Sequence, residues 1–178
     1  DAVPQLTGAN IPFAIRARVV LLRDLGAPLS PFNAWQIIQG LETVGLRMKQ
    51  HCANAEKVVT FLETQKKVQN VIYPTNHQGE IKDRALRYMK GGYGSLVGMD
   101  VGTKENGAKF IDNLKMLYHV ANIGDARSLA IHPATTTHSQ LSEKELLAAG
   151  VTPGYVRLSI GIEHPDDIIA DIKQALAA

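Results

Sequence analysis

The side chain with the clearest chemical potential is Arg157, which lies in an alternating stretch near the end of the chain. From Tyr155 to Ile160, polar and apolar residues alternate strictly, as they do in a strand with one face on a core. Arg157 is therefore expected on the polar face of this strand. Its guanidinium is always charged, and its planar fork fits a carboxylate with two hydrogen bonds. The pattern predicts an ion pair between domains or an anchor for a substrate carboxylate, and spacing alone leaves both interpretations open.

Two other groups of reactive side chains are weaker candidates. The spacing of His132, His138 and Cys52 matches no common zinc pattern, so no metal site is predicted. Ser139 and Ser159 lack the sequence that surrounds a nucleophile elbow. We expect the two histidines to organise a loop by hydrogen bonding and the cysteine to be a small packed side chain.

The composition limits the classes of function. The chain has 178 residues, of which 45% are hydrophobic and 20% charged, which suits one globular domain or slightly more. Nineteen basic residues against 17 acidic ones give a net charge of +2, too balanced to suggest nucleic acid or a membrane surface as a partner. A single cysteine excludes an internal disulfide and suits a reducing compartment. No apolar run approaches the roughly 18 residues that span a bilayer, and a cytoplasmic location is predicted.

The amino-terminal part is predicted to be helical. A helix is expected over residues 10–25, with Gly26 as the glycine that ends it. Ser30 and Pro31 have the residue types of an N-cap and of the first helical position. The helical pattern that they begin continues without another proline to about Gln65. A helix of this length in a small protein often crosses between domains.

Two glycines in that long pattern, Gly40 and Gly45, are the expected bend points. We divide the chain into residues 1–30, a lead-in segment and helix at a domain boundary, and residues 31–178, a domain that includes the long linking helix.

Short strands interleaved with helices follow. Residues 125–140 have little periodicity and many polar side chains, and a loop of this length is expected to be functional. Ser142 and Glu145 form a capping box that predicts the start of a short helix. The order of elements predicts an α/β protein of the α+β type, one sheet with helices on one face, so the face that bears Arg157 must contact something else. The expected strands cover residues 68–73, 95–101, 118–123 and 155–160, and the expected helices follow Gly79, Thr103, Ser142 and His164.

Several long motifs in this chain resemble one enzyme family. The downstream motifs are NIGDARSL (122–129), IHPATTTHS (131–139), GVTP (150–153) and VRLSIGIE (156–163). The upstream motifs are RDLGA (23–27), SPFNA (30–34), QGLET (39–43) and LRM (46–48). Together they resemble the carboxy-terminal domain of the cysteine/methionine-metabolism family of pyridoxal-phosphate (PLP) enzymes, over essentially the whole chain. The resemblance implies the small domain of a fold-type I transferase, with a mostly antiparallel sheet.

The resemblance also implies roles for three residues. The arginine that matches Arg157 holds the α-carboxylate of the amino-acid substrate in this family. The position that matches Asn122 lies beside the cofactor and contacts the same carboxylate, and the threonine that matches Thr137 lines the same pocket. Several relatives have serine at the position of Asn122. The asparagine in this chain therefore favours the sulfhydrylase branch of the family.

The resemblance further implies that most of the catalytic apparatus lies outside this chain. In the family the lysine that binds PLP, the aspartate at its pyridinium nitrogen and the phosphate-binding residues belong to a larger preceding domain. No lysine of this chain has a matching context, so no catalytic residue is assigned here, and the cofactor-binding residues stay unassigned. The chain also begins with Asp1 rather than Met. We expect a fragment that is inactive and binds no PLP by itself, with the preceding domain as its partner.

The resemblance to O-acetylhomoserine sulfhydrylases implies a parent enzyme that converts O-acetylhomoserine and sulfide into homocysteine and acetate. Methionine γ-lyase and cystathionine γ-synthase or γ-lyase are the alternatives within the family, and an autonomous small-molecule-binding or scaffolding domain is the alternative outside it. A homotetramer is expected from the family alone.

Overall fold

The computed structural model describes residues 11–178, and by internal contacts the chain divides into the compact units Asp1–Thr43 and Val44–Ala178. The predicted lead-in segment, residues 1–9, lies outside the described residues. The predicted domain division between residues 30 and 31 stays a prediction. Within residues 11–178, no helix is both long and apolar enough to cross a membrane.

The first unit consists of helices whose ends follow the predicted signals. The first helical stretch ends at Gly26, which has a left-handed φ of 62°. Ser30 caps α4 by accepting a hydrogen bond from the Asn33 N–H at 3.1 Å, and Pro31 is the first helical residue. None of these helices contains a buried residue. They are α2 (Pro12–Arg16), the π-helical η1 (Ala17–Leu22), α3 (Arg23–Leu25) and α4 (Pro31–Glu42).

The long helical pattern is divided in the structure. Helix α4 ends at Glu42, and α5 (Val44–Glu63) begins after Thr43. The interruption falls between Gly40 and Gly45, the two expected bend points. It coincides with the boundary between the two compact units.

The second unit is built around a five-stranded sheet in the order β1-β2-β5-β4-β3. Three neighbouring pairs are antiparallel and one, β3 with β4, is parallel, so the sheet is mostly antiparallel as expected. The strands are β1 (Asn70–Ile72), β2 (Leu96–Asp100), β3 (Tyr118–His119), β4 (Leu129–Ile131) and β5 (Tyr155–Ser159). The helical elements are α5, α6 (Gly79–Tyr88), α7 (Lys104–Asp112), η2 (Pro133–Thr135), α8 (Glu143–Ala148) and α9 (Pro165–Ala177).

One predicted loop contains a strand. Residues 125–140 were expected to lack regular structure, but β4 and the short 3-10 helix η2 lie inside this segment. All three residues of β4 are buried, so the strand has no polar face and no alternation by which to recognise it.

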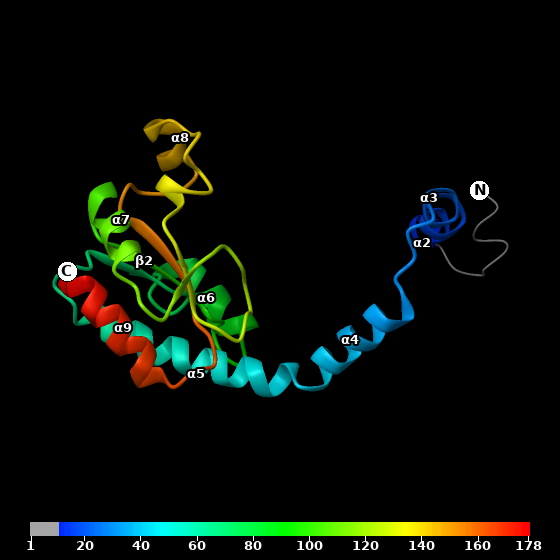
Figure 1. Ribbon diagram of the computed structural model, residues 1–178, viewed down its shortest axis with the longest axis horizontal. Coiled ribbons are helices and arrows are strands. Elements are labelled where there is room, and N and C mark those ends of the chain that lie inside the picture. Colours follow the sequence, from blue (N-terminus) through cyan, green and yellow to red (C-terminus); the bar gives the residue numbers. More distant parts are fainter. Residues whose placement is uncertain (1–10) are drawn as a thin grey trace. The chain divides into compact units, whose positions relative to one another are not determined.

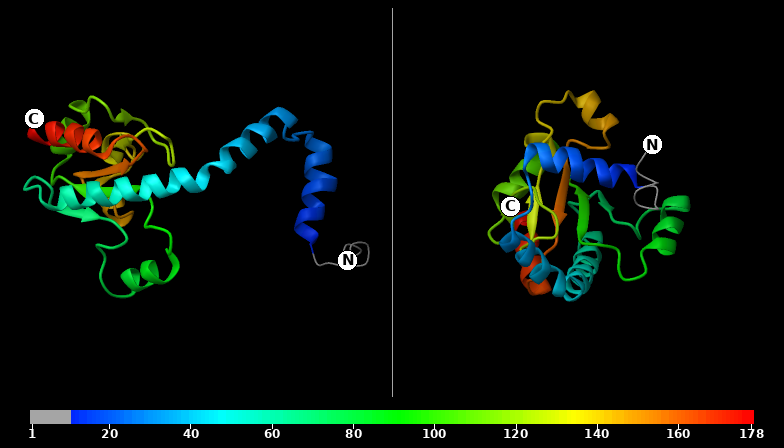
Figure 2. Two further views of the ribbon diagram at one scale, coloured as in Figure 1. Left: turned by 90° about the horizontal axis from the view of Figure 1, so that it is seen from below. Right: turned by 90° about the vertical axis from the view of Figure 1, so that its right-hand side faces the viewer.

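The core lies between one face of the sheet and helices α5, α7 and α9. Val156 and Leu158 of β5 are fully buried there, together with Val97 and Met99 of β2. In Figure 1, α5 and α9 lie side by side along the second unit. In Figure 2, α6 (green) lies on the side of the sheet away from α9 (red). The three packing helices thus cover one face, and the face that bears Arg157 is the other.

Candidate functional site

Arg157 occupies the centre of the sheet. It is the middle residue of β5, paired with Gly98 of β2 on one side and with Ile131 of β4 on the other. Its neighbours Val156 and Leu158 point into the core, so the Arg157 side chain points to the opposite face. Central strands of a sheet are its most constrained part, and the side chain therefore starts from a rigid backbone.

A cleft of about 500 Å³ lies on this face between the sheet and α6. Its walls are mainly apolar, with Ile72, Leu96, Ile81 and Met89 among the lining residues. Arg157 is one of the few polar groups that line it, with His77, Arg84 and the hydroxyls of Tyr88 and Tyr155. No lysine lines this cleft, so it offers no amine to a pyridoxal aldehyde.

The Arg157 guanidinium has no hydrogen-bond or ion-pair partner among residues 11–178, although the side chain is partly buried. The acids Asp125 and Glu163 interact with other residues. Asp125 accepts a hydrogen bond from the Arg127 N–H at 3.0 Å. Glu163 accepts from the backbone N–H and the hydroxyl of Ser128, at 2.6 and 2.9 Å. A partly buried cation without an acceptor is costly and is suited to an anionic ligand.

A buried polar network fixes the end of β5 beyond Arg157. His51 of α5 is fully buried, and its Nδ1 donates to the Ile160 carbonyl oxygen at 2.7 Å. The Asn54 amide donates to the carbonyl oxygens of Gly161 and Glu163, at 3.0 and 2.8 Å. Sequence analysis did not single out either α5 residue, because their partners lie 107 to 109 positions away in the chain.

The same network holds the loop that precedes β4. The Ser128 hydroxyl accepts from the Gly161 N–H at 2.8 Å while it donates to Glu163. A Cβ on Gly161 would lie 2.5 Å from the Ala126 carbonyl oxygen, so only glycine allows this loop to approach the end of β5. The strand of Arg157 and the loop after Asn122 are therefore locked together.

Asn122 and Thr137 lie outside the lining of the Arg157 cleft. Both are exposed: the Asn122 Oδ1 accepts from the Ile123 N–H at 2.9 Å, and the Thr137 hydroxyl is 2.8 Å from His138 Nδ1. Asn122 follows the last residue of β3 by three positions, and Thr137 follows the last residue of β4 by six. A joint role of these two residues with Arg157 stays a prediction.

His132 organises the loop after β4, as predicted. It is fully buried, its Nε2 donates to the Pro153 carbonyl oxygen at 2.8 Å, and its Nδ1 is 3.0 Å from the Thr135 hydroxyl. Burial lowers the pKa of His132, because desolvation disfavours the charged imidazolium. The prediction for Cys52 is also confirmed, since this side chain is packed and 8% exposed.

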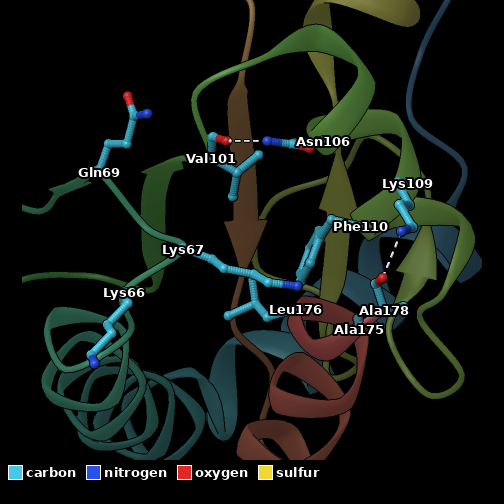
Figure 3. A pocket seen from close by; sticks show the side chains of 10 residues that line it. All are labelled: Lys66, Lys67, Gln69, Val101, Asn106, Lys109, Phe110, Ala175, Leu176 and Ala178. Atoms are coloured by element: carbon cyan, nitrogen blue, oxygen red, sulfur yellow. Dashed lines mark hydrogen bonds between the residues drawn. The ribbon is translucent and has the colours of Figure 1, made fainter.

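A second cavity, of about 290 Å³, lies beside the ends of α7 and α9 (Figure 3). Its charged lining residues are exposed lysines, and two of them have acceptors: Lys109 Nζ donates to the Ala178 carbonyl oxygen at 2.5 Å and Lys67 Nζ to that of Ala177 at 3.4 Å. In Figure 3 the Lys66 side chain points away from the other lining residues. We therefore place the candidate site at Arg157, whose charge is partly buried and has no ion-pair partner in the described part of the chain.

The sheet, its helix-covered face and the arginine cleft define an α/β domain with a mainly apolar cleft on the second face of its sheet. The chain belongs to the Cys/Met metabolism PLP-dependent enzyme family, whose profile matches residues 7–177. It is 52% identical over 171 residues to an O-acetyl-L-homoserine sulfhydrylase of Leptospira meyeri, a match that covers 95% of this chain and 39% of the relative. It is 42% identical over 171 residues to a homocysteine synthase of Schizosaccharomyces pombe, covering 96% of this chain and 40% of the relative.

A solved structure has the same fold. It is a crystal structure of a Campylobacter jejuni O-acetylhomoserine (thiol)-lyase that contains N'-pyridoxyl-lysine-5'-monophosphate, superimposing with a TM-score of 0.87 at 43% identity. The match covers 97% of this chain and 42% of that one. This chain thus spans about two fifths of the length of these relatives, and the predicted fold class is confirmed.

Proposed function

We propose that this chain is the carboxy-terminal part of a longer PLP-dependent enzyme that converts O-acetylhomoserine and sulfide into homocysteine and acetate. In this proposal Arg157 binds the α-carboxylate of the amino-acid substrate, and Asn122 and Thr137 contribute to the same pocket. PLP, held mainly by the rest of the longer protein, supplies the electron-accepting chemistry.

The observation that carries the proposal is Arg157 in a mainly apolar cleft, without an ion-pair partner among the residues that the structure describes. A guanidinium there can bind both oxygens of a carboxylate, and low polarity around the pair strengthens the interaction. Holding the carboxylate on a central strand orients the rest of the amino acid, and correct orientation can contribute several orders of magnitude in rate.

The large apolar side chains of the first unit support a partner domain. They remain exposed within the described residues, by 85% for Phe13, 76% for Leu25, 63% for Phe32, 55% for Trp35 and 60% for Leu41. An apolar surface of this extent favours burial against another protein surface. We propose the PLP-binding domain of the longer protein as that surface, and its absence would leave this chain inactive by itself.

The named relatives favour the sulfhydrylase reaction over the lyase alternatives, since they are O-acetyl-L-homoserine sulfhydrylases and homocysteine synthases. A homotetrameric assembly and a cytoplasmic location are further parts of the proposal and rest on the family resemblance.

Steady-state kinetics of the full-length protein test the role of Arg157. The Arg157→Ala variant should lose at least about 100-fold in kcat/KM for O-acetylhomoserine, because a charged hydrogen-bonded contact to the substrate is removed. Arg87→Ala is the matched control, since Arg87 is exposed on α6 and only stacks on Tyr88, 5.3 Å from its ring centre. An unchanged kcat/KM in Arg157→Ala would exclude the anchoring role.

A further inference from the structure

Tyr155 is brought to the side of Arg157 by a glycine in the neighbouring strand. The two residues lie on the same face of β5, two positions apart. Gly98, the cross-strand partner of Arg157, has no side chain, and the Tyr155 ring occupies the space. A Cβ on Gly98 would lie 2.7 Å from Tyr155 Cε2 and 3.1 Å from its hydroxyl oxygen. The phenol group is therefore placed over the position directly opposite Arg157.

The ring of Tyr155 is held in this position from two sides. It packs against a small apolar cluster of Ala134, Leu146 and Val151. On the other side it meets the backbone of Gly98 and lines the same cleft as Arg157. An aromatic ring fixed by packing presents its hydroxyl at little entropic cost.

The hydroxyl itself has no hydrogen-bond partner among residues 11–178. Burial raises the pKa of Tyr155, and the nearby Arg157 charge opposes this shift only in part. The phenol is therefore protonated at neutral pH and is available as a donor. A carboxylate bound by a guanidinium fork keeps further lone pairs that can accept a hydrogen bond.

We propose that Tyr155 is a second carboxylate-binding residue, whose hydroxyl donates to the same substrate carboxylate that Arg157 binds. The inference rests on the proposed function, because it concerns the ligand of the same cleft. Tyr155 then helps to select amino acids over amines that lack the carboxylate.

The test compares two inhibitors of the full-length, PLP-loaded protein: norleucine, which has no leaving group, and pentylamine, which is norleucine without its carboxylate. Tyr155→Phe keeps the packed ring and removes only the hydroxyl. It should weaken norleucine binding about tenfold, the equivalent of one hydrogen bond to a charged group, and leave pentylamine within about twofold. The control variant is Tyr93→Phe, which alters a partly buried tyrosine packed edge-on against Tyr73. It should change neither the inhibition constant of norleucine nor that of pentylamine.

A second variant changes the position of the Tyr155 hydroxyl without altering Tyr155 itself. Gly98→Ala should displace the Tyr155 ring and weaken norleucine binding, and its effect should largely disappear in a Tyr155→Phe background, because the two changes remove the same contact.

The outcomes separate the inference from the proposed function. Unchanged norleucine binding in Tyr155→Phe, with clear weakening in Arg157→Gln, would overturn the role of Tyr155 and leave that of Arg157 intact. Equal weakening of norleucine and pentylamine in Tyr155→Phe would indicate packing alone and would also overturn it. Unchanged norleucine binding in Arg157→Gln would refute the proposed function itself.

Discussion

The two faces of the sheet differ in how their side chains are packed. On the face covered by α5, α7 and α9, Val156 and Leu158 are fully buried in a continuous apolar core. On the other face, one residue away in the same strand, Arg157 lines an open cleft and has no hydrogen-bond or ion-pair partner among residues 11–178. A single strand thus contributes to the core on one face and lines the cleft on the other, and we propose that the cleft face binds a ligand.

The largest effect is expected on the helix-covered face. Leu158→Ala should destabilise the 178-residue chain by about 3 kcal/mol, because the truncation leaves a cavity in the core. Urea unfolding measures the change, and Leu147→Ala, at a 53% exposed position on α8, is the matched control with a change below about 0.5 kcal/mol. Equal effects of the two variants would remove the distinction between core and surface leucines.

A pH-dependent change in stability is expected from His132, which is hydrogen-bonded to the Pro153 carbonyl oxygen in the turn before β5. Its pKa is lowered in the folded protein, so the unfolded chain binds more protons once the pH falls below about 6.5, the ordinary value for histidine. Stability from the neutral imidazole is present above that pH and is lost as the pH falls. The unfolding midpoint should therefore drop between pH 7 and pH 5 by more in the wild-type chain than in His132→Gln. The same drop in the wild-type chain and in His132→Gln would show that His132 is not the source of the pH dependence.

The smallest effect is expected at the cleft. Arg157→Ala should change the free energy of unfolding of the chain by less than about 0.5 kcal/mol, since no hydrogen bond or ion pair within the described residues is lost. Urea unfolding beside Leu158→Ala gives the comparison directly. A loss above 2 kcal/mol would show that Arg157 has a structural role.

Local signals in the sequence predicted much of the fold. The capping box of Ser142 and Glu145 is present in both directions, as predicted. The alternation in residues 155–160 correctly placed Arg157 on the polar face of a strand. Each of these signals is carried by neighbours in the chain.

Features that depend on distant contacts were not predicted. Strand β4 is buried on both faces and lacks a pattern. The cleft wall from α6 and the anchoring of β5 by His51 and Asn54 join segments that are far apart in the sequence. The sequence placed Tyr155 on the polar face of its strand but gave no sign of a particular role. Its position beside Arg157 follows from the strand register, which sets its ring over Gly98.

The most direct test of the cleft as a carboxylate site is the equilibrium binding of norleucine and pentylamine to full-length, PLP-loaded Arg157→Gln. Our account predicts that the variant loses most of the preference for norleucine over pentylamine, while its unfolding midpoint stays that of the wild type. A variant that kept the wild-type preference would show that Arg157 does not bind the substrate carboxylate.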